Sequence, residues 1–124
     1  MGNLDKNGSA QPDTLAVGNG DGKITFPSVE AGTNSDNAIV QLVNSTNPAR
    51  SINFYVDVEP PVSFVHWSLN TNTTPALLTV YVDASELLPN ITYGANIVVN
   101  STQSRVANVP LTIPVLASVK DGLV

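Results

Sequence analysis

The feature that most constrains this chain is a two-residue alternation of apolar and polar side chains. It begins at Lys23 and is clearest over residues 51–58, SINFYVDV, where every second side chain is apolar. Because successive residues of a strand point to opposite faces, this alternation predicts half-buried β-strands. Similar runs cover residues 24–26, 38–42, 62–69, 78–82, 93–99 and 109–119, and no long stretch has a helical period.

About seven short strands with turn residues between them predict an immunoglobulin-like antiparallel β-sandwich, with a β-barrel as the second alternative. The bulky side chains of Phe64 and Trp67 are candidates for its core. Pro110 and Pro114 fall within the last run. Because proline has no N–H to donate to a neighbouring strand, we expect this strand to lie at a sheet edge or to change sheets.

Residues 1–22 are rich in Gly, Asn and Asp and contain little apolar material. Such a segment cannot bury enough surface to offset the entropy of ordering it. We therefore predict an N-terminal docking arm or linker over 1–22 and a sandwich over 23–124. The apolar patch Leu15, Ala16 and Val17 is expected to add as a short strand to a sheet edge of another subunit.

The charge of the chain argues against two classes of partner. Ten acidic and five basic residues give a formal net charge of −5. Nucleic acids and anionic membranes attract basic surfaces, so neither is an expected partner. No apolar stretch approaches the ~20 residues that span a bilayer, and Met1 does not open a signal segment. Either a signal has been removed or the protein reaches its place by another route, such as virion assembly inside a host cell.

The residues that could carry catalysis do not form a recognisable motif, so we expect no enzyme, no catalytic residue and no cofactor. His66 is the single histidine and no Gly-x-Ser-x-Gly sequence accompanies it. Asp57 and Glu59 are suitably spaced for a glycosidase pair, but they flank the end of a predicted strand, where solubilising carboxylates are common.

Two further motifs are explained better by turns than by ligands. The sequence Asn19–Ile24, NGDGKI, is similar to half of a calcium-binding loop, but Val17 and Ser28 occupy its first and twelfth positions, so two carboxylate ligands are absent and no metal site is expected. Asn-x-Ser/Thr sequons occur at five positions, and in a chain this rich in Asn, Ser and Thr turn chemistry accounts for most of them. The five are Asn7, Asn44, Asn72, Asn90 and Asn100.

Aromatic rings on an outer face would suit a sugar, because rings stack on pyranoses while amides and hydroxyls bind the sugar hydroxyls. Tyr55 and Tyr81 fall on predicted outward positions, and Trp67 is a third candidate. These three residues are therefore the predicted glycan-facing set.

Residues 73–119 carry a sequence pattern, TTPALLTVYVD followed by LLPNITYG, NIVVNS and VPLTIPV. This pattern resembles the BACON-like immunoglobulin-like repeats of bacteria and phages, and a weaker match extends back to about Lys23. The resemblance implies the same sandwich fold. Tyr93, just after a proline-containing corner, is placed like the tyrosine that locks such a corner through a hydrogen bond to upstream backbone.

These observations favour a non-catalytic structural or adhesive module on a virion or extracellular surface, of the capsid-decoration or head-fibre type, with the arm docked on the assembly. Its expected partners are capsid or other assembly subunits, which include copies of itself, and host-surface or extracellular glycans. The resemblance implies the alternative of a carbohydrate-binding accessory domain from a secreted bacterial protein.

Overall fold

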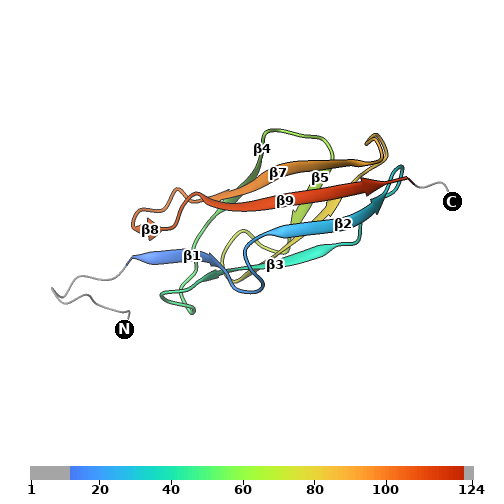
Figure 1. Ribbon diagram of the computed structural model, residues 1–124. Coiled ribbons are helices and arrows are strands. Elements are labelled where there is room, and N and C mark those ends of the chain that lie inside the picture. The colour runs from blue at the N-terminus through green and yellow to red at the C-terminus, as the bar shows by residue number, and fades with distance from the viewer. Residues whose placement is uncertain (1–11, 122–124) are drawn as a thin grey trace.

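The computed structural model describes residues 12–121, which form nine β-strands in two facing sheets (Figure 1). In this part of the chain, no helix is long and apolar enough to cross a membrane. The strands are β1 (Asp13–Val17), β2 (Ile24–Glu30), β3 (Ala38–Asn44), β4 (Tyr55–Glu59), β5 (Val65–Leu69), β6 (Ala76–Val82), β7 (Ile91–Asn100), β8 (Val106–Ala107) and β9 (Leu111–Lys120).

The strand order identifies the sandwich as immunoglobulin-like. One sheet has the order β5-β6-β3-β1-β8 and the other β2-β9-β7-β4. The strands β1 and β2 are consecutive in the chain but lie in different sheets, where β1 pairs antiparallel with β3 and β2 pairs parallel with β9. Without β8, the order reproduces the four-strand and three-strand sheets of an immunoglobulin domain, with β2 added beside the last strand. The predicted fold is thus confirmed.

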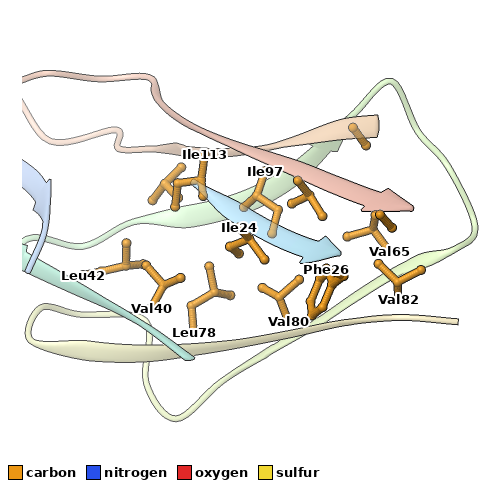
Figure 2. Packing of buried hydrophobic residues seen from close by; sticks show 14 of the residues in the cluster. Ile24, Phe26, Val40, Leu42, Val65, Leu78, Val80, Val82, Ile97 and Ile113 are labelled. Atoms are coloured by element: carbon orange, nitrogen blue, oxygen red, sulfur yellow. The ribbon is translucent and has the colours of Figure 1, made fainter. Parts of the chain in front are cut away.

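The core fills the space between the sheets (Figure 2). Leu42 and Leu78 from the five-stranded sheet face Ile97 and Ile113 from the four-stranded sheet, and all four side chains are fully buried. Their sequence neighbours on each strand point outward, as the alternation predicted. Val56 is only half-buried, because β4 is an edge strand that the opposite sheet covers incompletely.

The corner between β6 and β7 is fixed by Tyr93. Its hydroxyl accepts a hydrogen bond of 3.0 Å from the backbone N–H of Leu88, five residues upstream. The ring makes an edge contact with Phe64, with centroids 5.5 Å apart. The predicted tyrosine corner is confirmed.

The last strand neither lies at a sheet edge nor changes sheets, so that prediction is wrong. β9 lies between β2 and β7. Pro114 pairs with Asn96 of β7, whereas the pairing with β2 begins only at Val115. At Pro114, β9 therefore has β7 as its only neighbour and its other side is unpaired. On that unpaired side no N–H is needed, so a proline there costs the sheet no hydrogen bond.

The predicted boundary between an arm at 1–22 and a sandwich from 23 is also wrong. Strand β1 belongs to the five-stranded sheet, where it pairs with both β3 and β8. The segment 18–23 is the crossing from one sheet to the other. Within the predicted arm, residues 1–11 lie outside the described residues. The local pattern of apolar and polar residues did not predict β1, because the strands that stabilise it, β3 and β8, are distant in the chain.

The inside and outside positions can be tested with Ile97→Asp. An unpaired carboxylate in the fully buried position of Ile97 should cost several kcal/mol and unfold the domain. The matched control is Leu116→Asp on the outer face of the same sheet, which should change the stability little. Urea unfolding followed by circular dichroism measures both, and similar midpoints for the two variants would contradict the orientation of β7.

Candidate functional site

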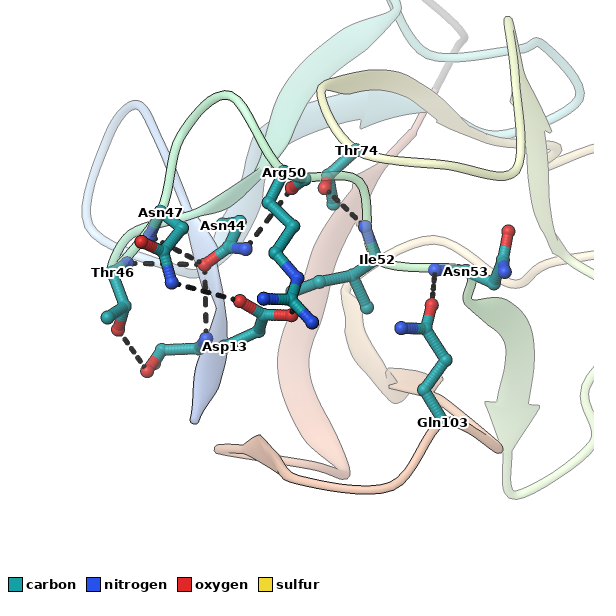
Figure 3. A network of polar contacts seen from close by, with 10 residues as sticks. Asp13, Asn44, Thr46, Asn47, Arg50, Ile52, Asn53, Thr74 and Gln103 are labelled. Carbon is teal, nitrogen blue, oxygen red and sulfur yellow. Dashed lines mark hydrogen bonds and ion pairs between the residues drawn. The ribbon is translucent and has the colours of Figure 1, made fainter. Parts of the chain in front are cut away.

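One end of the sandwich is organised by the buried side chain of Asn44 (Figure 3). Its Oδ1 accepts hydrogen bonds from the backbone N–H groups of Thr14, Thr46 and Asn47 at 3.1–3.3 Å. Its Nδ2 donates to the carbonyl of Arg50 at 3.1 Å. A single amide therefore connects β1, the end of β3 and the loop 45–54.

The carboxylate of Asp13 reinforces the same connection. Oδ1 accepts a hydrogen bond from Nδ2 of Asn47 at 3.1 Å, and Oδ2 lies 3.1 Å from Nε of Arg50. The Asp13 side chain is almost fully buried whereas Arg50 is largely exposed. No buried side-chain nitrogen or oxygen in residues 12–121 lacks a partner. These polar groups are committed to holding the loop, so their role is structural.

Two other loops join this end. The backbone N–H of Ile52 donates to Oγ1 of Thr74 at 2.9 Å. The N–H of Asn53 donates to Oε1 of Gln103, and Oγ of Ser101 donates to the Asn53 carbonyl at 2.6 Å. Loops 45–54, 70–75 and 101–110 are thus held together by side chains, which gives this end a preformed polar surface.

The three residues of the predicted docking strand are already used within the domain. Leu15 is fully buried and pairs with Asn44, and Val17 packs against the core. Only Ala16 faces outward, beside Val43. The prediction that this patch adds to another subunit is therefore wrong for Leu15 and Val17, because their apolar side chains complete the domain's own core.

The three predicted glycan-facing residues do not share a surface. Tyr55 is 51% exposed on the outer face of the four-stranded sheet, whereas Tyr81 is on the outer face of the five-stranded sheet. Trp67 pairs with the buried Val80, so it points to the core side, but it remains 39% exposed because β5 is an edge strand. A single aromatic platform built from all three is thus excluded, as is a fully buried Trp67.

His66 packs on the surface. Its ring stacks on Tyr81, with centroids 5.0 Å apart and an interplanar angle of 8°. Its Nε2 is 3.8 Å from Oδ2 of Asp83, which is too long for a hydrogen bond. Asp83 instead accepts a hydrogen bond from the N–H of Ser85 at 2.9 Å, and this bond lowers the pKa of the Asp83 carboxyl. The arrangement is that of a turn-capping aspartate beside a surface histidine.

Asp57 and Glu59 both lie exposed on β4, two positions apart. Because β4 is an edge strand, their carboxylates face open solvent on the outer side of the sheet. Oδ1 of Asp57 accepts a hydrogen bond from the N–H of Val58 at 3.0 Å. The position on the strand fits the solubilising role that the sequence indicated.

The segment that is similar to a calcium-binding loop is a turn, and the side chain of its first residue, Asn19, makes hydrogen bonds to the backbone of β3. Oδ1 of Asn19 accepts a hydrogen bond from the backbone N–H of Gln41 at 2.6 Å, and Nδ2 of Asn19 donates one to the carbonyl of Ile39 at 3.1 Å. Asn19 thus bonds β3 where β1 has ended. No group of three or more metal-ligating side chains occurs in residues 12–121.

The sequons differ in their accessibility. Asn44 is buried and its amide is fully engaged, so it is not an accessible acceptor. Asn72 and Asn90 are exposed, and Asn90 occupies a left-handed turn position with φ of 65°. Asn7 lies outside the described residues.

A surface that the sequence reasoning missed covers the outer side of the five-stranded sheet. Its strands contain one Asp, Glu, Lys or Arg, and this residue, Asp13, is buried. Ile39 and Leu77 are 54% and 43% exposed on it. A shallow hollow of about 290 Å³ lies next to them, lined by Gln41, Val43, Pro75, Ala76 and Leu77. The outward position of Ile39 in the alternating run at 38–42 carried part of this signal, and Leu77 directly precedes the run at 78–82.

Asn44→Ala tests the structural role of the loop network. The change leaves three backbone N–H groups without their acceptor, so we expect a loss of about 2–4 kcal/mol in the free energy of unfolding. Asn72→Ala is the control, because the Asn72 side chain is exposed and its backbone carbonyl makes the contact to Phe54. Equal urea midpoints for the two variants would contradict the network.

No protein-family model matches the sequence, and no curated protein matches it. Among solved structures, the chain is similar to a Bacteroides ovatus GH5 xyloglucanase in complex with a XXXG heptasaccharide, with a TM-score of 0.51 and 14% identity. The match covers 85% of this chain and 19% of the xyloglucanase, so the chain spans about a fifth of that protein.

Titin domain M7 is similar over 88% of this chain and 96% of its own, with a TM-score of 0.50 and 5% identity. Domains 4 and 5 of the S-layer protein SbsC match 90% of this chain and 48% of theirs, with a TM-score of 0.47 and 19% identity. At such identities the likeness concerns the fold. The match over nearly the whole titin domain agrees with an immunoglobulin-like sandwich.

Proposed function

We propose that this chain is a non-catalytic immunoglobulin-like module displayed on a virion or extracellular surface, where it contacts other proteins of the assembly. The observation that carries the proposal is the placement of its first and last strands. β1 begins at one end of the long axis and β9 ends at the other (Figure 1). A module entered at one end and left at the other can be joined in line with neighbours while both outer sheet faces stay free.

The internal construction supports the same role. The loops at the β1 end are tied to each other by Asn44, Thr74 and Gln103, so they form a fixed surface. A preformed surface loses little conformational entropy when a partner binds. The net charge of −5 keeps copies of the chain from aggregating. Contact with a protein partner can use the outer face of the five-stranded sheet, whose strands expose no Asp, Glu, Lys or Arg.

The first test is the location of the native protein. An antibody against the chain should detect it in purified particles or in the cell-surface fraction, because a display module remains with its assembly. Recovery of the chain only as a soluble secreted fragment would contradict the proposal.

The contribution of the predicted arm can be tested separately with a chain that lacks residues 1–11. This deletion keeps β1, and circular dichroism checks that the sandwich has formed. Reduced incorporation with an intact fold supports docking through residues 1–11. Unchanged incorporation assigns the contact to the sandwich itself.

A second candidate is a carbohydrate-binding accessory domain, which the exposed ring of Tyr55 favours. Asn100 is its direct partner across β4 and β7, so a ring and an amide lie side by side on the outer face. This pairing suits a sugar that stacks on the ring. The likeness to a xyloglucanase bound to a heptasaccharide makes xyloglucan oligosaccharides the first ligands to try.

Calorimetric titration with such an oligosaccharide tests this candidate. If Tyr55 carries the binding, Tyr55→Ala should reduce the affinity at least tenfold, because the ring supplies the stacking surface. Tyr81→Ala, on the other sheet, should leave the affinity unchanged. Equal losses in both variants, or no binding by the unmodified chain, would contradict a site at Tyr55.

A further inference from the structure

The outer face of the five-stranded sheet, here called the uncharged face, differs from the rest of the molecule. It is made by the outward side chains of β1, β3, β6 and β5, among them Ile39, Gln41, Leu77, Thr79 and Tyr81. The strands themselves expose no Asp, Glu, Lys or Arg on this side, and His66 lies at one side of the face, 3.8 Å from the carboxylate of Asp83, which directly follows β6. The opposite sheet carries Glu30, Asp57, Glu59 and Lys120 on its strands.

We propose that the uncharged face is the interface of a symmetric dimer, in which a second copy of this chain covers it. The first argument is charge. Each copy has a formal net charge of −5, so two copies repel each other wherever carboxylates approach. Apart from Asp83 beside His66 at one side, the uncharged face brings the two chains together with their carboxylates kept away from the contact. Depletion of charge and exposed aliphatic side chains also characterise the centres of protein interfaces.

The second argument is shape. Ile39 of β3 is 54% exposed, and the hollow of about 290 Å³ lies on the same face, where Gln41, two positions further along β3, belongs to its lining. In a two-fold dimer, a residue of one copy contacts a site on the other, and the reverse contact repeats it. Ile39 of each copy would therefore enter the hollow of its partner. We infer that the exposed aliphatic side chain and the hollow on one face complement each other across the two-fold axis.

The size of the face limits how much surface the dimer can bury. Four strands spaced by about 4.8 Å, each of up to seven residues that rise about 3.3 Å, cover a rectangle of about 19 by 23 Å, or roughly 440 Å². A standard stable interface buries about 800 Å² on each partner. The face is smaller, so the dimer is weak and its population rises between micromolar and millimolar concentrations. This inference does not depend on the proposed function.

Sedimentation equilibrium of the full chain at rising concentration tests the dimer. We expect reversible association that Ile39→Lys and Leu77→Lys each weaken at least tenfold, because each places a cation in an apolar contact. The matched control is Leu116→Lys, since Leu116 is 47% exposed on the opposite sheet. It should associate like the unmodified chain. All three positions are exposed, and circular dichroism verifies that the variants fold.

Salt and cross-linking give independent readouts. Raising the salt concentration should preserve or strengthen the association, because it screens repulsion between the acidic copies. The chain has no cysteine, so Gln41→Cys on the uncharged face should form a covalent dimer under mild oxidation much faster than Thr112→Cys on the opposite sheet.

Four results would overturn the proposal. They are a monomer at millimolar concentration, an equal effect of Leu116→Lys and Ile39→Lys, a loss of association in high salt, and equal cross-linking of the two cysteine variants. Capture of a monomeric chain by a neutral polysaccharide, lost in Ile39→Lys, would also overturn it and would assign the face to a glycan.

Discussion

The structure depends on the burial of alternate side chains between two sheets. The chain has no cysteine, so no disulfide supports the sandwich, and apolar side chains from both layers must exclude water by themselves. Leu42, Leu78, Ile97 and Ile113 are fully buried at the centre of this contact (Figure 2). Because a strand alternates strictly, the same residues that fix the core leave every other position for the outer faces. The surfaces available to a partner are therefore a consequence of the core.

Beyond the ends of the strands, asparagine side chains make the hydrogen bonds to backbone groups. Asn44, at the end of β3, accepts hydrogen bonds from three backbone N–H groups. Asn19, beyond the last residue of β1, makes two hydrogen bonds to the backbone of β3. Each bond satisfies a backbone group that the sheet does not. The abundance of Asn in this sequence thus has a structural role, and it explains why the sequon at Asn44 is not a surface feature.

The two outer faces have different chemistry. The four-stranded sheet shows carboxylates on β4 and a tyrosine beside an amide, whereas the strands of the five-stranded sheet expose no Asp, Glu, Lys or Arg; both sheets carry exposed aliphatic side chains. A displayed module with two unlike faces can bind another copy of itself or another protein of the assembly through one face and a different ligand through the other. The rigid loop end adds a third surface, which is polar and built from amides and hydroxyls.

The alternation determined the all-β class and the inward side chains of most strands, and the position of Tyr93 after a proline-containing corner determined its hydrogen-bonded corner, because these follow from local periodicity and turn chemistry. The tertiary structure decided which strands became neighbours. Leu15 joined the core because β3 and β8 pair with β1, and β9 became an inner strand because β2 pairs with it on the side away from β7. Trp67 stayed partly exposed because its strand is at an edge. Sheet order is set by contacts between residues far apart in the chain, and no local pattern records them.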